Sequence, residues 1–587
     1  MTKEERFTEN IFGLDTETIK GFCRLLCLSD GRVFKIFNQN DVIALFQTLS
    51  KTKKTYFMCW NADFDIQSLL KYFEKRTLDF LLRGLELEYS WPMGDDVYSF
   101  SMQYIPGKFF RFNQNFIFDA YQYYGTKLGI AAEKYLGESK HDVDASKITE
   151  DNIFDPITVD YCINDALLAL KLFLKFRAAL PETMKHIKPI SNAFYSFAYF
   201  RSELVVNKPR WDVNNYFRNA YHGGRFEIMT RGHFKNLYTY DINSAYPYEI
   251  SKLRGLKSHF VSSFSAYMKD ASYSVYHVKV DIKDKFISPL VYKDKGLCVY
   301  PVGHFEGYIT KGEFERIREY GPTIIEAFHI FADREYPFAE KIRELYLKKN
   351  STEFSLPFKT IMNSLYGRTA MSTLKFVKVE DLDKEVPIVD FVDLDGTAYV
   401  KFEDIARSNF VYASEITART RLRLYDLIKA YPEDILMVQT DSVISKKALE
   451  ELPLSNKLGE WKLQKWDEAY LIGSGVYFYR IGEEWFGKFR GFNLGEEKVK
   501  IILERILKSK GGTVEFQSLK RFSLQEARRL HDEDLGNQIL EVGRKLKLNF
   551  DRKRVWKGAW SSGADVKRKK IHSLAIYSSS IDKSPKV

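Results

Sequence analysis

Three ordered segments constrain the fold of this chain more than any other feature of its sequence. They are Tyr240–Pro247 (YDINSAYP), Lys359–Gly367 (KTIMNSLYG) and Val438–Ser442 (VQTDS). The first and third segments each offer one aspartate, Asp241 and Asp441, at the end or turn of an apolar run. The second segment offers a lysine, an asparagine and a tyrosine along one predicted helix. Two carboxylates that hold metal ions, with a cation and an aromatic ring aimed at a nucleotide, are what templated phosphoryl transfer needs.

The two aspartates are predicted to face each other at the end of a small sheet. Leu237–Tyr240 is predicted as a short strand that ends at Asp241, and 435–438 and 443–445 as the two strands of a hairpin. The tip of that hairpin would present Asp441 rigidly opposite Asp241. An exposed turn aspartate is the ordinary alternative, because turns favour Asp and Ser.

A pair of helices is predicted between these two aspartates. The first helix covers 337–349 and the second covers 355–366, with a short polar stretch between them. Lys359, Asn363 and Tyr366 recur at helical spacing on the second helix, so they share one stripe of its surface. A lysine on a helix is ordinarily just solvated, and it is the whole nonapeptide that favours a functional interpretation.

Together the three segments resemble the polymerase motifs of family B DNA polymerases. The resemblance implies that Asp241 and Asp441 are metal ligands, and that Tyr246 lies under the incoming sugar and excludes a 2′-hydroxyl. It also implies a set of nucleotide-binding residues from the two helices: Lys359, Asn363, Tyr366, Arg343 and Lys348. Two positions depart from the family pattern, Gln439 where an aspartate is usual and Ala245 where a bulkier residue is common.

Acidic residues recur at three places near the N-terminus. Asp15 and Glu17 follow a predicted buried strand, and residues two apart in a strand point to the same face, so the two can share one metal ion. Two further pairs have the spacing of a metal-dependent nuclease: Asn61 and Asp65 at the start of a predicted helix, and Tyr161 and Asp165 on one face of another. Taken singly, each has an ordinary alternative as a surface carboxylate or a core tyrosine.

As an ordered set, these residues resemble the DEDD 3′–5′ exonuclease domain of proofreading polymerases. The resemblance implies hydrolysis by two metal ions held by Asp15, Glu17, Asp65 and Asp165, with Tyr161 positioning the attacking water. It further implies three contacts to the frayed primer end: Thr18, Asn61 and Phe64, the last by stacking on a base. The stretch 140–143 loosely resembles a lysine motif that supports the exonuclease of protein-primed enzymes.

Two other motifs match DNA-contacting segments of the same family. One is a Tyr-x-Gly-Gly motif, which links the exonuclease and polymerase domains and contacts template DNA, formed here by Tyr221, Gly223 and Gly224. A simple turn between domains is the alternative for this flexible pair of glycines. The other is a Lys-x-Tyr motif that holds the primer. Tyr477 fits its tyrosine, Gly475 occupies its lysine position, and the segment 488–491 (KFRG), with Lys488 and Arg490, is a candidate for the missing charge.

Length and charge agree with a large nucleic-acid-binding protein. A chain of 587 residues is too long for one core, so several domains are expected. The net charge of +11 favours a polyanionic partner. From Glu541 to Val587 there are 13 Lys or Arg against 4 Asp or Glu. This end is therefore predicted either to grip DNA phosphates or to be a solvated basic tail.

Cysteine spacing and hydropathy exclude other classes of protein. The five cysteines show no paired CxxC spacing, so neither a zinc site nor a disulfide framework is expected. No apolar run approaches the length of a membrane span, and residues 1–6 lack a signal-peptide stretch. We therefore expect a soluble intracellular protein with no membrane partner, in the host cytoplasm if a phage or plasmid encodes it.

The expected fold class is multidomain α/β: an RNase H-like DEDD exonuclease domain followed by a right-hand polymerase of palm, fingers and thumb with two insertions. The predicted boundaries are 1–190 for the exonuclease domain, 191–254 and 411–500 for the palm, 336–370 for the fingers, and 501–587 for a basic thumb and C-terminal tail. The insertions are expected at 255–335 and 371–410, and the second contains Asp395-Gly396, a hairpin signal. They resemble the two terminal-protein regions of protein-primed polymerases of phages, adenoviruses and linear plasmids.

These resemblances imply a DNA-dependent DNA polymerase with 3′–5′ proofreading, primed by the hydroxyl of a separate terminal protein. Its expected partners are a DNA template, a primer strand and deoxynucleoside triphosphates, and its expected cofactor is Mg²⁺, two ions per active site, with Mn²⁺ as a substitute. Three alternatives stay open. One is a family B polymerase that uses ordinary nucleic-acid primers or none. Another is an exonuclease whose degenerate polymerase half only binds DNA, and the last is a non-catalytic replication scaffold.

Overall fold

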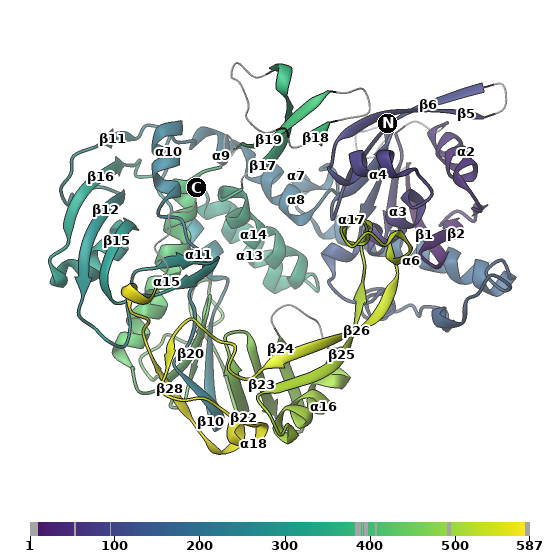
Figure 1. The fold of residues 1–587 in the computed structure, drawn as a ribbon. Coiled ribbons are helices and arrows are strands. Elements are labelled where there is room, and N and C mark those ends of the chain that lie inside the picture. Colours follow the sequence, from purple (N-terminus) through teal and green to yellow (C-terminus); the bar gives the residue numbers. More distant parts are fainter. Residues whose placement is uncertain are drawn as a thin grey trace.

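Several α/β units make up the chain, as the multidomain α/β prediction expects (Figure 1). The computed structural model describes residues 10–51, 54–93, 96–371, 373–381, 389, 391–392, 397–404, 408–489 and 495–581.

The N-terminal part is built on an eight-stranded mixed sheet in the order β3-β2-β1-β4-β8-β7-β6-β5. β1, β4 and β8 are parallel neighbours, and the other pairs are antiparallel. Its strands are β1 (Ile11–Ile19), β2 (Phe22–Leu28), β3 (Val33–Lys35), β4 (Tyr56–Cys59), β5 (Glu86–Met93), β6 (Asp96–Ile105), β7 (Phe109–Phe112) and β8 (Asn115–Asp119). Helices α2 (Gln39–Ser50), α3 (Ala62–Leu70) and α4 (Lys75–Leu82) belong to the same part.

The long helix α6 (Pro156–Ala179) packs directly on β1. A Cβ atom at Gly13 would lie 1.8 Å from the carbonyl oxygen of Ala166. Only glycine therefore lets α6 come this close to the strand. The close approach brings Asp165, the neighbour of Ala166, next to Asp15 on β1.

A second sheet, called the central sheet below, is antiparallel and has the order β24-β23-β22-β10-β21-β20-β9, with β28 paired to β10 and β27 to β28. Its strands are β9 (Phe226–Ile228), β10 (Thr230–Ile242), β20 (Ile435–Gln439), β21 (Ser442–Ser445), β22 (Trp461–Gly473), β23 (Val476–Ile481), β24 (Glu484–Phe489), β27 (Val555–Trp556) and β28 (Ile571–Leu574). Helix α15 (Phe410–Ala430) packs on β10 and the β20–β21 hairpin through Leu424, Tyr425 and Ile428. The strands predicted around Asp241 and Asp441 are confirmed.

The predicted helix pair is also confirmed, as α13 (Ala339–Ser351) and α14 (Ser355–Thr369). The two helices pack against each other and on α8 (Asn192–Tyr199) and α11 (Ala245–Ser251). On α14 the core side is apolar, made by Pro357, Phe358, Ile361, Met362 and Leu365. Along the predicted stripe, Lys359 is exposed and Asn363 is half-buried, whereas Tyr366 packs against the edge of this core.

Among the described residues, three smaller sheets lie between β10 and α15 in sequence. The first has the order β11-β16-β12-β15 and is built from β11 (Phe260–Ser262), β12 (Tyr273–Ile282), β15 (Gly303–Thr310) and β16 (Thr323–Phe331), with α12 (Lys311–Ile317) between β15 and β16. The second is the pair of β13 (Tyr292–Asp294) and β14 (Leu297–Val299), and the third contains β17 (Thr373–Lys378), β18 (Phe391–Val392) and β19 (Ala398–Asp404). β18 and β19 pair antiparallel, as the hairpin prediction expects. Its turn, Asp395-Gly396, lies outside the described residues.

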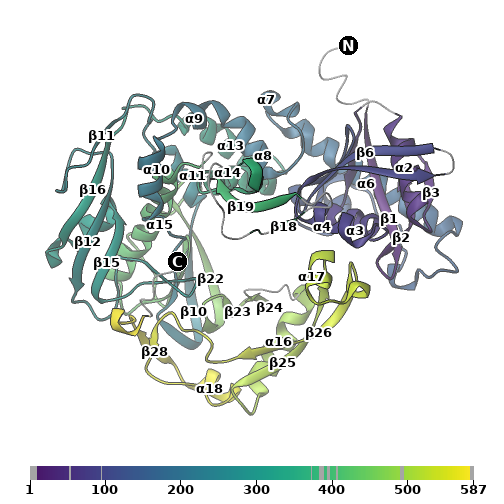
Figure 2. The same cartoon turned by 45° about the horizontal axis from the view of Figure 1, so that its top comes forward.

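The C-terminal segments connect the central sheet to the N-terminal part. After α16 (Gly495–Lys508), the hairpin of β25 (Thr513–Arg521) and β26 (Ile539–Lys547) carries α17 (Leu524–Arg529) at its tip. Leu524 packs in the same core as Ile66 and Leu70 of α3. The ribbons consequently form a ring, which Figure 2 shows with α17 next to α3 and α4.

The basic C-terminal stretch is not a free tail over its described length. After the hairpin the chain returns to the central sheet through α18 (Gly563–Arg568) and β28, which pairs with β10. The prediction of a solvated tail is therefore wrong for the backbone up to residue 581. The side chains of 567–570 are exposed on this folded segment.

The five cysteines are unpaired, as their spacing predicted, and four of them are buried in the N-terminal part. Within the part of the chain that the structure describes, no helix combines the length and apolarity that crossing a bilayer requires.

Candidate functional sites

Asp241 and Asp441 lie side by side at one end of the central sheet. Asp241, the last residue but one of β10, pairs with Ser442 in antiparallel register. Asp441 lies in the turn between β20 and β21, and its carbonyl accepts a hydrogen bond of 2.9 Å from the Ile242 amide. Thr440 adopts φ +53°, which closes the turn tightly. Strand pairing thus fixes the two aspartates on adjoining backbone positions.

The pKa of both carboxyl groups is raised. Burial is the main cause at each, and repulsion by Asp241 adds to it at Asp441, whose pKa is about 6. The positive charge of Lys359 lowers the pKa of both aspartates. Lys462 on β22, the strand partner of Asp241, also lowers the pKa of Asp241. Two neighbouring carboxylates that are costly to ionise are suited to binding a cation.

Lys349 on α13 is a site residue that the sequence analysis missed. Its Nζ donates a hydrogen bond of 3.1 Å to Ser244 Oγ, and its charge acts on Asp241. The predicted residues of this helix were Arg343, which is exposed, and Lys348. Successive residues of a helix point in different directions, so Lys349 rather than Lys348 faces this aspartate. The sequence alone does not show which of two adjacent lysines on a helix faces the site.

Gln439, the last residue of β20, is buried and held by Tyr477, whose hydroxyl donates a hydrogen bond of 3.3 Å to the amide oxygen. Gly475 lies in the turn between β22 and β23 with φ +84°, a conformation that a lysine adopts only with strain. On β24, Lys488 pairs directly with Tyr477, so the two side chains share one face. The charge of Lys488 lowers the pKa of both aspartates. A cation therefore reaches the site from the neighbouring strand.

Three predicted nucleotide or DNA contacts form one cluster of tyrosines. The hydroxyls of Tyr221 and Tyr366 lie 2.6 Å apart, and the ring centroids of Tyr246 and Tyr366 lie 4.5 Å apart. A Cβ atom at Gly224 would lie 2.8 Å from Thr440 Cγ2 and 2.9 Å from the Tyr246 hydroxyl. Gly224 therefore allows its segment to pass against the aspartate turn and the tyrosine cluster. Asn363 lies one helical turn before Tyr366, half-buried.

Buried charges fix the Gly-Gly segment from α15. Arg421 is fully buried and pairs with Glu313 of α12 at 2.7 Å. The same guanidinium donates hydrogen bonds to the carbonyls of His222 at 2.8 Å and Gly223 at 3.0 Å. The position of this segment is consequently set by two elements that are distant from it in sequence, α12 and α15.

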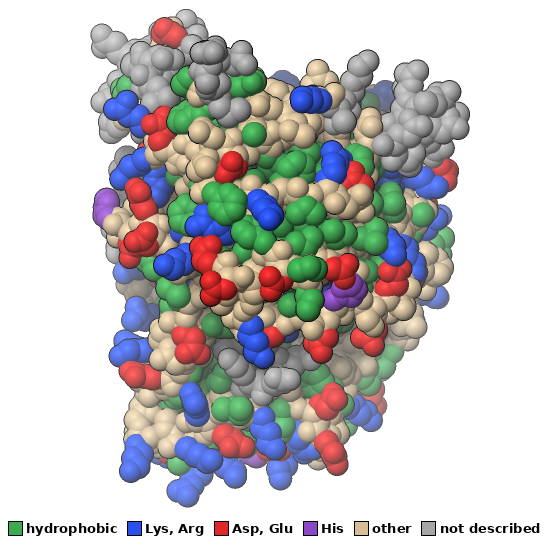
Figure 3. Space-filling model, turned by 90° about the vertical axis from the view of Figure 1, so that its right-hand side faces the viewer, with side chains coloured by type: hydrophobic (Ala, Val, Ile, Leu, Met, Phe, Trp, Pro, Cys, Tyr) green, Lys and Arg blue, Asp and Glu red, His purple; other side chains and the backbone are tan. Residues whose placement is uncertain are grey.

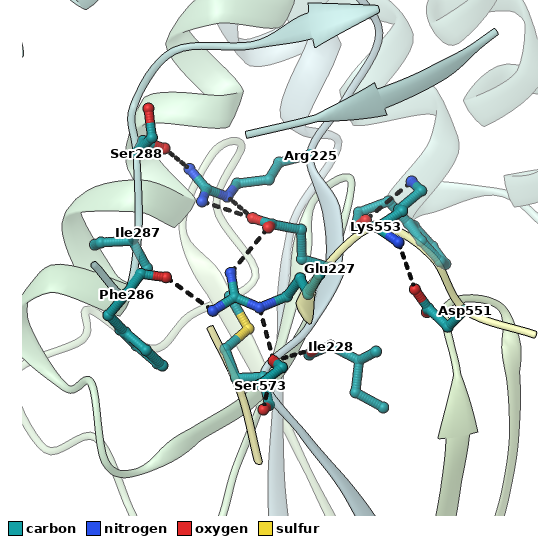
Figure 4. Close-up of polar contacts among 12 residues, drawn as sticks. Arg225, Glu227, Ile228, Phe286, Ile287, Ser288, Asp551, Lys553 and Ser573 are labelled. Atoms are coloured by element: carbon teal, nitrogen blue, oxygen red, sulfur yellow. Dashed lines mark hydrogen bonds and ion pairs between the residues drawn. The ribbon is translucent and has the colours of Figure 1, made fainter. Parts of the chain in front are cut away.

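A second buried network follows the Gly-Gly segment directly (Figure 4). Arg225 and Arg554 both pair with Glu227, at 2.6 and 3.0 Å. Arg554 also donates to Ser573 Oγ at 2.7 Å and to the Phe286 carbonyl at 2.8 Å. All three charged side chains are buried. The network ties the C-terminal segment to the strand that follows the glycines.

The N-terminal carboxylates gather where β1, α3 and α6 meet. Ligand atoms of Asp15, Glu17 and Cys162 lie within 4.8 Å of one another. Asp65 accepts a hydrogen bond of 2.7 Å from the Thr16 hydroxyl. Burial and mutual repulsion raise the pKa of Glu17 to about 8, and burial raises that of Asp65 to about 7. The pKa of Asp15 is also raised, by burial first and then by its acidic neighbours.

Lys140 joins this cluster, although its motif is weak in the sequence. Its ammonium group pairs with Asp165 and lies 4.6 Å from the centroid of the Tyr161 ring. Oδ1 of Asp165 is buried and has no hydrogen-bond partner within the described residues. An unpartnered carboxylate oxygen among four acidic groups fits a divalent ion that prefers oxygen ligands. Asp241 and Asp441 offer the same donor chemistry.

The three predicted contacts to a primer end lie on the elements that carry this cluster. Thr18 follows an irregularity in the pairing of β1 with β2. Asn61 adopts φ +67° before α3, and its backbone N–H donates a hydrogen bond of 2.8 Å to Asp119 Oδ1. Phe64 lies in the first turn of α3, with the guanidinium of Arg521 at 5.4 Å from its ring centroid. No sequence signal had connected Arg521 with this region.

Charges of both signs cover the face of the molecule on the N-terminal side. Figure 3 shows acidic and basic side chains interspersed there, with Lys and Arg gathered along the lower edge. On this face, electrostatic attraction for a polyanion is therefore concentrated at that edge.

Comparison with known proteins places this geometry among polymerases. A profile of the family described as DNA polymerase type B, organellar and viral, matches residues 98–422. The DNA polymerase of Acidianus bottle-shaped virus (isolate Italy/Pozzuoli) is 26% identical over 432 residues, which cover 68% of this chain and 60% of that protein. A probable DNA polymerase of Ascobolus immersus is 24% identical over 352 residues, covering 54% of this chain and 29% of that protein. The chain thus spans less than two thirds of the length of these relatives.

Solved structures with a similar fold include Phi29 DNA polymerase. Its complex with primer-template DNA and incoming nucleotide superposes with a TM-score of 0.64 at 14% identity, covering 92% of this chain and 99% of that one. Its orthorhombic crystal form gives a TM-score of 0.65. At this level of identity, the likeness concerns the fold.

Proposed function

Because the chain belongs to the organellar and viral family of type B DNA polymerases, we propose that it copies a DNA template into DNA and removes nucleotides from the 3′ end of the new strand. The observation that carries the proposal is the juxtaposition of Asp241 and Asp441 by strand pairing, with Lys359 close enough to act on both. The cluster of Asp15, Glu17 and their acidic neighbours supports the nuclease half.

In the synthetic reaction, the primer 3′-hydroxyl attacks the α-phosphate of a deoxynucleoside triphosphate and pyrophosphate leaves. Divalent ions, Mg²⁺ or Mn²⁺, held by Asp241 and Asp441 would polarise the phosphate and favour ionisation of the hydroxyl. Lys359 and Lys349 offset the negative charge of the triphosphate from the helix pair. Lys488 and Tyr477 hold the primer strand from the sheet.

The tyrosine cluster positions the sugar and the base. In this proposal Tyr246 lies under the deoxyribose, where a 2′-hydroxyl would collide with its ring, and Tyr366 packs near the new base pair. The hydrogen bond between Tyr221 and Tyr366 holds the second ring in place. Gly223 and Gly224 allow the template strand to pass close to the backbone.

In the nuclease reaction, water attacks the terminal phosphodiester of a single strand. Asp15, Glu17, Asp65 and Asp165 would hold two metal ions, which supply the activated water and stabilise the leaving oxygen. Tyr161, with Lys140 at its ring, orients that water. Thr18, Asn61 and Phe64 hold the end of the strand.

We further propose that the first nucleotide is added to the hydroxyl of a separate protein. The support is the presence of additional sheets, within 260–331 and 373–404, at the positions where the sequence resembles terminal-protein regions. Co-expression with the neighbouring genes and labelled nucleotide should transfer label to a second protein, in a bond that resists denaturant. Extension of DNA and RNA primers without any labelled protein would instead favour ordinary priming.

One assay tests the two activities together. The purified protein is given Mg²⁺, labelled deoxynucleotides and a primed template, and the assay is repeated with Asp441→Ala and Asp15→Ala. We expect Asp441→Ala to lower extension by more than about a hundredfold, because it removes a direct metal ligand. Asp15→Ala should lower primer degradation by a similar factor and leave primer extension unchanged.

Each outcome decides a different part of the proposal. No extension by the unmutated protein would reject the polymerase. Extension that survives Asp441→Ala would reject the site assignment. Degradation that survives Asp15→Ala would reject the nuclease assignment and leave the polymerase untouched.

A further inference from the structure

Arg521, at the end of β25, reaches the N-terminal carboxylate cluster from the far end of the chain. Its Nη2 donates a hydrogen bond of 2.7 Å to the Asp63 carbonyl, and its Nε donates one of 3.1 Å to Asn537 Oδ1. Its guanidinium lies 5.4 Å from the centroid of the Phe64 ring. Asp63 and Phe64 begin α3, directly before Asp65. An arginine of the C-terminal hairpin is therefore part of the wall of the candidate nuclease site.

The tip of the hairpin holds this arginine in place. Asn537 is 1% exposed, adopts φ +61°, and donates a hydrogen bond of 3.0 Å to the Phe64 carbonyl. Lys71 donates one of 2.8 Å to the Gly536 carbonyl. Leu524 is 4% exposed in the core that contains α3. The guanidinium is thus fixed before any ligand arrives, which lowers the entropy cost of binding.

The hydrogen-bond partners of Arg521 are neutral oxygen atoms. Among the described residues, both of its hydrogen bonds end on amide oxygens, whereas the carboxylate of Asp63 accepts from the Tyr104 hydroxyl at 2.8 Å and the Gly107 amide at 2.9 Å. Burial lowers the pKa of Arg521, although the charges of Asp63, Tyr104 and Asp65 act in the opposite direction. A partly buried cation whose hydrogen bonds end on neutral oxygen atoms is suited to an anionic ligand.

We infer that Arg521 binds a backbone phosphate of a single-stranded DNA 3′ end, next to the base that stacks on Phe64. Its hydrogen bonds to described residues use Nε and Nη2, so in this proposal Nη1 donates to a phosphate oxygen. Arginine suits this role because its planar guanidinium has five N–H donors, so it can keep its hydrogen bonds to the protein while it donates another to a phosphate. The inference rests on the proposed nuclease function and adds to it a residue from the C-terminal end of the chain.

The test measures 3′-end removal from a single-stranded oligonucleotide over a range of salt concentrations. Arg521→Ala should lower kcat/KM by about tenfold, as expected for one charge-assisted contact. The slope of log kcat/KM against log salt should become shallower by about 0.7, the contribution of one neutralised phosphate of a single strand. Arg521→Lys keeps the charge and should keep the slope. Binding of the same oligonucleotide in EDTA, followed by fluorescence anisotropy, should show the same change in slope.

Arg529→Ala is the matched control. Arg529 is on the same tip, with a side chain 79% exposed, and should change neither quantity. An equal loss in Arg521→Ala and Arg521→Lys with an unchanged slope would mean that Arg521 only packs the tip, and the inference would be overturned. Wild-type behaviour of Arg521→Ala would overturn it as well. Absence of nuclease activity in the unmutated protein would instead reject the proposed function.

Discussion

At the scale of the residue, burial of like charges controls both candidate sites. Asp441 beside Asp241, and Glu17 beside its acidic neighbours, are all harder to ionise than free carboxyl groups. A bound proton and a bound metal ion satisfy such a site in the same way, so they compete. This competition predicts a measurable pH dependence of stability in the metal-free protein.

Glu17→Gln is expected to flatten that pH dependence. Folding raises the pKa of Glu17 from 4.5 to about 8, so its stabilising effect is fully present below pH 4.5 and is lost as the pH rises through 8. Between these values the wild-type protein in EDTA should lose up to about 1.4 kcal/mol more per pH unit than the variant. Urea unfolding at several pH values measures the difference, and Mg²⁺ should abolish it. Parallel curves for the two proteins would contradict the assignment of Glu17 to a shared acidic site.

At the scale of the element, buried ion pairs join strands that are far apart in the sequence. Glu227 lies on β9 and Arg554 precedes β27, and their ion pair joins the C-terminal segment to that strand. The chain offers several Arg and Glu residues, and their spacing does not reveal which of them meet. The helix pair α13–α14 was predictable because its apolar periodicity is local, whereas this network depends on three distant segments.

Glu227→Ala is expected to destabilise the protein by about 3–5 kcal/mol, because it leaves two buried guanidinium groups without their partner. The exposed pair of Glu319 and Lys429, 3.1 Å apart with side chains 55% and 52% exposed, provides the control. Glu319→Ala should cost less than about 1 kcal/mol. The free energy of unfolding in urea measures both. Equal effects of the two substitutions would show that the buried network contributes no more than a surface pair.

At the scale of the whole molecule, the C-terminal tip closes the chain onto its N-terminal part. Residues 521–537 contact α3 through Leu524, Asn537 and Arg521, more than four hundred residues away in sequence. The position of α3, and with it Asp65, is therefore sensitive to the C-terminal end. Any loosening of this closure should affect the N-terminal carboxylate cluster before it affects Asp241 and Asp441.

Leu524→Ala is expected to cost about 2–5 kcal/mol of local stability, because it empties a buried position in the N-terminal core. Amide exchange in α3 should accelerate and 3′-end removal should fall more than primer extension. Leu530→Ala, on the same tip but with a side chain 50% exposed, should change neither. If exchange in α3 is the same in both variants, the tip does not stabilise that helix.

Local patterns in the sequence were sufficient to predict the strands that lead to Asp241 and Asp441. They also predicted that Lys359, Asn363 and Tyr366 share one stripe of a helix, and that Asp15 and Glu17 lie on one face of a strand. These follow from the periods of strands and helices, which act over a few residues. Only the tertiary structure decided that Lys349 faces Asp241, that Lys488 supplies a charge beside Tyr477, and that Arg521 reaches α3. Such contacts depend on how distant segments pack, and the sequence of one segment does not show which distant segment it will contact.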